Sequence, residues 1–181
     1  MSVTSAKKNV QDTTTDFLPL EGTDYVEFYV GNAKQAAHYY ITAFGFQALA
    51  YSGPETGFKD RASYAVRQHK LTFVLTTPLK TGNAIADHLY KHGDGVKALS
   101  LRVPDATSAW KETTRRGAKS YMEPQLLKDE DGEVVMSGIH TYGDTVHLFI
   151  ERKNYKGAFM PGYREWSNPH FKPADTGLLY V

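Results

Sequence analysis

Histidine is the residue type in this 181-residue sequence whose spacing could support metal chemistry. His88 and His92 are four positions apart, so on a helix both imidazoles face the same side, together with Ile85 and Leu89. Two imidazoles one turn apart can begin a zinc site. No third ligand is evident, so the pattern favours packing at a junction between modules, with His92 bonded to the turn Gly93–Gly95.

The other five histidines give weaker signals. His140 and His147 flank a Tyr-Gly-Asp turn and are expected to be cross-strand neighbours, where ordinary sheet histidines are far commoner than metal ligands. His38 lies beside an apolar helix stripe and is expected to face solvent. His69 and His170 lie in polar surroundings and indicate no site. The histidines therefore favour structural roles, with a small metal site as the alternative.

Composition excludes several classes of protein. The sequence has no cysteine, which rules out disulfides and thiolate metal ligands, and its net charge of +1 argues against a broad nucleic-acid or membrane surface. No window approaches eighteen consecutive apolar residues. Residues 1–16 are polar and lack the apolar core of a secretory signal. We therefore expect a cytoplasmic protein with a disordered tail at residues 1–16.

A strand followed by an amphipathic helix opens the ordered part of the chain. Residues 25–30 are apolar and aromatic enough for a buried strand, Asn32 is a suitable N-cap, and Gly45 is placed to end the helix. The helix carries one continuous apolar stripe at helical spacing, formed by Ala33, Ala36, Ala37, Tyr40, Ile41 and Phe44. Three strand-like runs follow: FQALAYSG, RASYAVRQ and KLTFVLTT. The predicted order is β-α-β-β-β.

The same order returns later in the chain. Residues 96–119 read as a strand and a helix, with Asp105 as N-cap and Gly117 at the helix end. Asp105 lies 73 positions after Asn32, so the two helices begin in the same register. Three further strand candidates follow, and Asp131-Gly132 between the first two is a strong hairpin signal. The sequence therefore contains an internal structural repeat.

The repeat predicts an α+β fold made of paired β-α-β-β-β modules. We place the modules at about residues 22–79 and 95–153, joined by a helix at 83–92, within one domain at 17–153. A four-stranded sheet with one helix has one bare face, and two such sheets side by side form a curved mixed sheet with a concave cleft. This architecture resembles the vicinal-oxygen-chelate superfamily, the glyoxalase-like fold.

Local phrases sharpen the resemblance. YYITAFGF, AYSGPETG, HGDGV, VPDA, YGDTVHLFIER and FMPGY occur in that order. Together they resemble the N-terminal half of the 4-hydroxyphenylpyruvate dioxygenase family, over roughly residues 17–181. The resemblance implies an Fe(II) dioxygenase of tyrosine catabolism that converts 4-hydroxyphenylpyruvate, an aromatic 2-oxo acid, and O2 to homogentisate and CO2. It also implies that a two-histidine, one-carboxylate ligand set lies in the C-terminal half, outside this sequence.

The module symmetry tests this expectation at three positions. Ligands on the first strands of the two modules would lie near Tyr25 and Ala98, and a carboxylate on the last strand would fall at Leu148 or Phe149. None of these side chains holds Fe(II) as an imidazole or carboxylate would. We therefore predict no metal, cofactor or catalytic residue in this chain, and no activity from it alone.

Residues 154–181 are expected to be a connector toward a C-terminal catalytic domain. Their aromatic side chains alternate with Gly and Pro, which predicts irregular structure: Tyr155, Phe159, Tyr163, Trp166 and Phe171. An ordered connector that buries its rings across the sheet is favoured over an exposed interface or ligand lid.

Three other functions remain open. Hydroxymandelate synthase has a similar N-terminal half. A stand-alone, metal-free module of the bleomycin-resistance type would bind a small ligand in its cleft, and a glyoxalase-like enzyme would share metal ligands between subunits. The expected partners are the chain's own C-terminal domain and further copies in a homo-oligomer.

Overall fold

The structure is a computed structural model that describes residues 16–167, 171 and 173–181. The predicted tail at residues 1–16 lies outside the described residues, except for Asp16. Within the described residues, no helix is long and apolar enough to cross a membrane.

The first module has the predicted β-α-β-β-β order. Its elements are β1 (Thr23–Tyr29), α1 (Ala33–Phe44), β2 (Gln47–Ser52), the 3-10 helix η1 (Pro54–Thr56), β3 (Arg61–Gln68) and β4 (Leu71–Pro78). Asn32 caps α1 because its side-chain oxygen accepts a hydrogen bond from the Gln35 N–H at 3.0 Å. Gly45 ends the helix in the left-handed region, at φ 76°. Both helix boundaries are confirmed.

The second module repeats this order after a linking helix. Its elements are α2 (Ala84–His92), β5 (Gly95–Arg102), α3 (Ala106–Arg115), β6 (Ser120–Asp129), β7 (Gly132–His140) and β8 (Val146–Glu151). Asp105 caps α3 by accepting from the Ser108 N–H at 2.8 Å. The predicted hairpin is confirmed, with Asp129 opposite Gly132.

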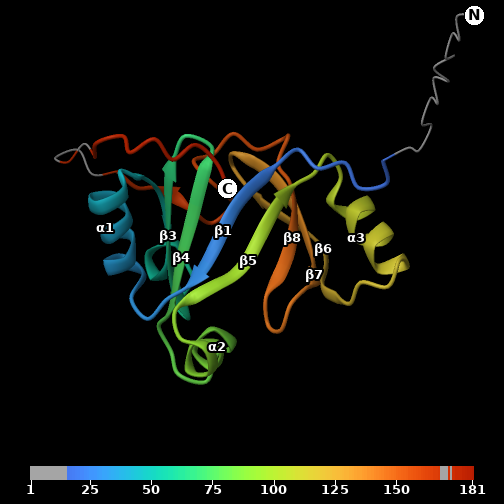
Figure 1. The fold of residues 1–181 in the computed structure, drawn as a ribbon, viewed down its shortest axis with the longest axis horizontal. Helices are drawn as coiled ribbons and strands as arrows, with labels where there is room; N and C mark the ends of the chain where they lie inside the picture. Colours follow the sequence, from blue (N-terminus) through green and yellow to red (C-terminus); the bar gives the residue numbers. More distant parts are fainter. Residues whose placement is uncertain (1–15, 168–170, 172) are drawn as a thin grey trace, which may run out of the picture.

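The two modules form one curled mixed sheet (Figure 1). With β9 (Arg164–Glu165) at one edge, the strand order in the described residues is β6-β7-β8-β5-β1-β4-β3-β2-β9. In each module the first strand runs parallel to the last, β1 to β4 and β5 to β8. The modules meet where β1 pairs antiparallel to β5, with Val26 opposite Leu99. In this strand order the two modules are related by an approximate two-fold axis.

Three apolar clusters hold the sheet and helices together. One lies between α1 and its module, where Phe46 and Val66 are completely buried, and a second lies under α3 around Phe149. The third covers the inner face of the sheet and joins residues of both modules, including Tyr25 and Leu148. In Figure 1, α1 and α3 flank opposite ends of the sheet. Each module therefore has an outer core of its own and shares an inner one.

The aromatic segment after β8 crosses this inner face. Phe159 is buried and meets the Tyr25 ring edge-on at 5.4 Å, whereas the half-buried Trp166 meets the Tyr64 ring at 4.9 Å on the α1 side of the sheet. The segment therefore buries these rings, as expected of an ordered connector, whereas Phe171 is exposed. The expectation of wholly irregular structure was wrong at one point, because Arg164–Glu165 pairs with β2.

Candidate functional site

The inner face of the sheet brings three of the four tested ligand positions together. Tyr25 on β1, Ala98 on β5 and Leu148 on β8 all belong to the inner cluster. Phe149 faces the other way, into the core under α3. The register therefore places Leu148, and not Phe149, at the position where a carboxylate would complete a metal site.

A cleft of about 490 Å³ opens on this inner face. Its residues come mainly from β1, β3, β6, the start of α2 and the segment that follows β8. They include Tyr25, Glu27, Tyr29, Phe58, Arg61, Ser63, Thr76, Tyr121, Met122, Leu148, Met160 and Tyr163. Aromatic and apolar groups that surround a few polar ones are typical of a site for a small molecule.

Glu27 is the carboxylate at the centre of the polar groups. Its Oε1 accepts a hydrogen bond from the Thr76 hydroxyl at 2.7 Å, and Thr76 is itself 2.9 Å from the Ser63 hydroxyl. Removal from water raises the pKa of Glu27, while the Thr76 hydrogen bond and the positive charges of Arg61 and Lys97 oppose the rise. Glu27 is therefore a carboxylate of the cleft whose negative charge is only partly compensated.

The phenols of the cleft are neutral hydrogen-bonding groups. Burial raises the pKa of Tyr25 well above its ordinary value, and the negative charge of Glu27 raises it further. Burial also raises the pKa values of Tyr29 and Tyr163. A phenol that keeps its proton is a poor metal ligand at neutral pH.

The donor set of the cleft does not match Fe(II). Of the three inner positions, Tyr25 holds a protonated phenol, and Ala98 and Leu148 have no donor atom. Among the described residues, no group of three or more His, Cys, Asp or Glu side chains is arranged to hold a metal ion. Glu27 and Asp60 are the carboxylates of the cleft, and no imidazole lies among the cleft residues, so the two do not replace the missing ligand set.

His88 and His92 lie together, as their spacing predicts. Their ring centroids are 4.6 Å apart, and His88 also meets the Tyr29 ring edge-on at 5.3 Å. The expected partner of His92 was wrong: its Nε2 lies 2.8 Å from Oδ2 of Asp144, in the β7–β8 turn, instead of bonding the adjacent glycine turn. Burial and the charge of Lys97 lower the pKa of His88. The pair ties α2 to β1 of the first module through His88 and to the β7–β8 turn of the second through His92.

The other histidine pair does not converge. Ile139 is opposite His147 in the β7–β8 ladder and His140 is opposite Val146, so the two imidazoles project to opposite faces of the sheet. The expectation that they are cross-strand neighbours was therefore wrong. His38 is exposed, as expected, and His170 lies outside the described residues.

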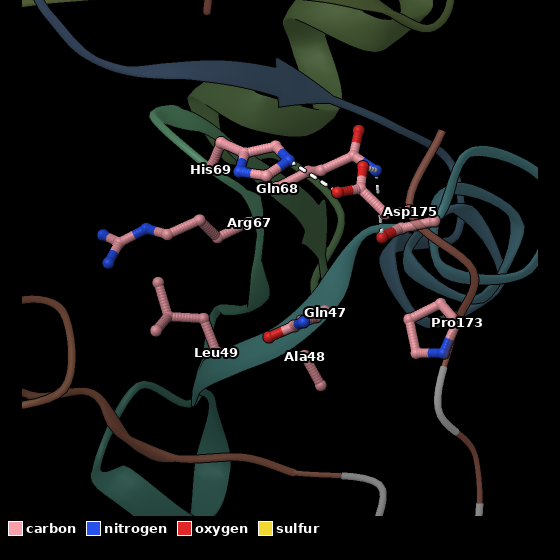
Figure 2. A pocket seen from close by; sticks show the side chains of 9 residues that line it. Gln47, Ala48, Leu49, Arg67, Gln68, His69, Pro173 and Asp175 are labelled. Atoms are coloured by element: carbon pink, nitrogen blue, oxygen red, sulfur yellow. Dashed lines mark hydrogen bonds and ion pairs between the residues drawn. The ribbon is translucent and has the colours of Figure 1, made fainter. Parts of the chain in front are cut away.

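His69 takes part in a contact that the sequence did not indicate. Its Nε2 lies 2.9 Å from Oδ2 of Asp175, and the Gln68 amide donates to the other oxygen of Asp175 at 3.3 Å (Figure 2). Thr176 accepts from the same amide at 3.2 Å. These bonds hold residues 173–181 against the β3–β4 turn, beside a cavity of about 440 Å³.

Glu27 is the functional candidate that sequence reasoning missed. The signal was present, because Tyr25, Glu27 and Tyr29 alternate along one strand and so share a face. A carboxylate between two tyrosines on a buried strand is unusual unless that face borders a cleft.

Comparison with known families identifies the fold and the position of this chain. A family model described as hydroxyphenylpyruvate dioxygenase, N-terminal, matches residues 15–160. The chain belongs to this family of dioxygenase domains. Curated 4-hydroxyphenylpyruvate dioxygenases are similar to it: the protein of Coccidioides posadasii is 44% identical over 167 residues, and that of Dictyostelium discoideum is 47% identical over 146 residues.

The alignments cover most of this chain and less than half of each relative. They include 85% of the chain and 42% of the Coccidioides protein, and 80% of the chain and 40% of the Dictyostelium protein. The chain thus spans about two fifths of the length of the curated relatives it matches, in their N-terminal domain.

Solved structures agree with the fold. A mutant of 4-hydroxymandelate synthase from Streptomyces coelicolor superposes with a TM-score of 0.72 at 25% identity, covering 90% of this chain and 45% of that one. Methylmalonyl-CoA epimerase from Mycobacterium tuberculosis gives a TM-score of 0.58 at 18% identity, over 72% of this chain and 87% of its own. The predicted glyoxalase-like fold of paired modules is confirmed.

Proposed function

We propose that this chain serves as the N-terminal domain of a 4-hydroxyphenylpyruvate dioxygenase. The whole enzyme would convert 4-hydroxyphenylpyruvate and O2 to homogentisate and CO2 in the tyrosine catabolism of the cytoplasm. The observation that supports this most strongly is the family match over residues 15–160, together with relatives 44% to 47% identical.

We further propose that the Fe(II) of the enzyme is bound by a C-terminal domain outside this sequence. The side chains at Tyr25, Ala98 and Leu148 support this proposal, because they leave the inner face without a ligand set. The work of this domain is then structural: it braces the catalytic domain and contributes to contacts in a homo-oligomer. Nucleic acids and membranes are not among its proposed partners, consistent with the net charge of +1.

The first experiment measures O2 consumption with 4-hydroxyphenylpyruvate and Fe(II). The 181-residue chain is expected to consume no O2 above a metal-only blank, whereas the native full-length protein is expected to turn over. Turnover by the chain alone would contradict the assignment of the chemistry to another domain. Inactivity of the full-length protein would contradict the assigned reaction.

Hydroxymandelate synthase is the second candidate, favoured by the superposition on that enzyme at a TM-score of 0.72. The product of the native protein distinguishes the two assignments: chromatography would identify it as homogentisate or as 4-hydroxymandelate. A metal-free binding module is a third candidate, supported by the cleft of about 490 Å³. Saturable binding of aromatic acids by a native protein of 20.3 kDa would favour it.

A further inference from the structure

A separate cavity of about 550 Å³ lies beside the start of β1 and the β3–β4 turn. Its lining differs from that of the aromatic cleft, because it consists mainly of charged side chains. The residues that line it are Glu21, Gly22, Thr23, Asp24, Arg67, His69, Lys70, Thr72, Arg102, Tyr180 and Val181. Positive groups therefore meet here from β3, β5 and the turn between β3 and β4.

The buried carboxylate of Asp24 already forms ion pairs with two arginines at this cavity. Asp24 is almost completely buried, and its Oδ2 accepts from Nε and Nη2 of Arg102 at 2.9 and 2.8 Å. Its other oxygen, Oδ1, accepts from Arg152. The two hydrogen bonds from Arg102 to Oδ2 and the contact of Arg152 with Oδ1 together engage both oxygens of Asp24, so this carboxylate has little capacity for a third cation.

Arg67 is that third cation. Its Nε donates to the Thr72 hydroxyl at 3.0 Å, and among the described residues it forms no ion pair with a carboxylate. Removal from water lowers the pKa of Arg67, and the nearby positive charge of Arg152 lowers it further. Both effects disfavour the positive charge of the Arg67 guanidinium, and a bound anion would offset them.

The negative charge of Asp24 opposes the lowering of the Arg67 pKa only in part, and among the described residues neither Asp24 nor Glu21 forms an ion pair with Arg67. Asp175 is engaged by His69 and by the Gly177 N–H at 2.8 Å. In Figure 2 the Arg67 side chain extends away from Asp175, toward which His69 points. The Lys70 ammonium adds a further positive charge to the wall of the cavity.

We propose that this cavity binds an oxyanion, a phosphate or a small carboxylate, through the Nη groups of Arg67. Arg102 and Lys70 supply the surrounding positive charge. A guanidinium presents parallel N–H donors that match two oxygens of either anion, which a lysine cannot do. The proposal does not depend on the reaction assigned to the whole enzyme.

The test is calorimetric titration of the native-length protein with inorganic phosphate and, separately, with acetate, in a chloride buffer of constant ionic strength. Saturable binding of phosphate alone would identify a phosphoryl ligand, and saturable binding of acetate a carboxylate ligand. Arg67→Gln is expected to raise the Kd at least about tenfold, since hydrogen bonds to charged groups contribute strongly. Arg115→Gln, which removes an exposed positive charge from α3, should leave the Kd unchanged.

A second measurement covers the case in which Arg67→Gln fails to fold. Nitrogen-15 NMR of arginine Nε in the unaltered protein should show a saturable shift of the Arg67 signal with the same Kd as the titration. The proposal is overturned if neither anion binds more tightly than chloride, if Arg67→Gln binds like the unaltered protein, or if the Arg67 signal does not move.

Discussion

The two modules share a topology and differ in the chemistry of their inner faces. The first presents Tyr25, Glu27 and Thr76 to the cleft, and all three carry polar groups. The second presents Ala98 and Leu148, which cannot titrate or ligate. A repeat can therefore keep its strand order and helix caps while each copy changes what its inner side chains do. The carboxylates and aliphatic hydroxyls of the cleft come from the first module, whereas the second adds the Tyr121 phenol and the Gln125 amide.

The largest expected effect tests whether each module has its own outer core. Phe46 and Phe149 are 0% and 1% exposed, under α1 and α3 respectively. Phe46→Ala and Phe149→Ala should each lower the free energy of unfolding by about 3–5 kcal/mol, because each removes a fully buried ring. Urea denaturation measures both values. Phe44→Ala, at a side chain 38% exposed, is the control and should cost much less; equal losses at Phe44 and Phe46 would contradict the assigned core.

The helix caps provide a smaller and symmetrical comparison. Asn32→Ala and Asp105→Ala should each cost about 1 kcal/mol of unfolding free energy. The Asp105 variant should cost more, because the Ser108 hydroxyl also donates to Asp105 at 2.8 Å and a negative charge is favoured at a helix N-terminus. Thermal denaturation at pH 7 measures the difference. A larger loss for Asn32→Ala would show that the second cap is not the stronger one.

Glu27 should give the first module a pH dependence of stability that comes from a raised pKa. A carboxyl whose pKa is raised by folding favours the folded state when protonated, and this contribution is lost as pH rises from the ordinary value of 4.5 through the raised value. Glu27→Gln should therefore stabilise the protein at pH 7, and the gain should shrink toward pH 4.

The measurement is the difference in unfolding free energy between Glu27→Gln and the unaltered protein across that pH range. The matched control is Glu123→Gln, an exposed glutamate on β6 of the second module. It should change stability by less than about 0.5 kcal/mol at either pH. A Glu27→Gln variant that is less stable than the unaltered protein at pH 7 would contradict the raised pKa.

The smallest and most local expected effect distinguishes two His–Asp contacts, His69–Asp175 and His92–Asp144. The hydrogen bond from the Gly177 N–H and the contact with His69 lower the pKa of Asp175. The contribution of Asp175 to the stability of the folded state is therefore present above its ordinary pKa of 3.8 and is lost as pH falls through the lowered pKa. Asp175→Asn should speed amide hydrogen exchange at Gly177 at neutral pH. Asp144→Asn, which breaks the contact with His92, is the matched control and should leave that exchange rate unchanged. Equal exchange in the two variants would mean that Asp175 does not hold the segment.

The sequence predicted what depends on neighbours along the chain. The Asn32 and Asp105 caps, the apolar stripe of α1 and the β6–β7 hairpin all follow from residues within a few positions, so the paired fold could be inferred. The partners of His92 and Glu27 could not. His92 meets Asp144 52 positions away, and Glu27 meets Thr76 49 positions away, so these contacts depend on how the sheet closes.

The most direct test of the central claim is the iron content of the protein after reconstitution with Fe(II) under anaerobic conditions and exhaustive dialysis. Mass spectrometry of the metal should find no retained iron in the 181-residue chain and stoichiometric iron in the native full-length protein. Stoichiometric iron in the 181-residue chain, lost on Glu27→Gln, would contradict the account and would place a metal site in the cleft of the first module.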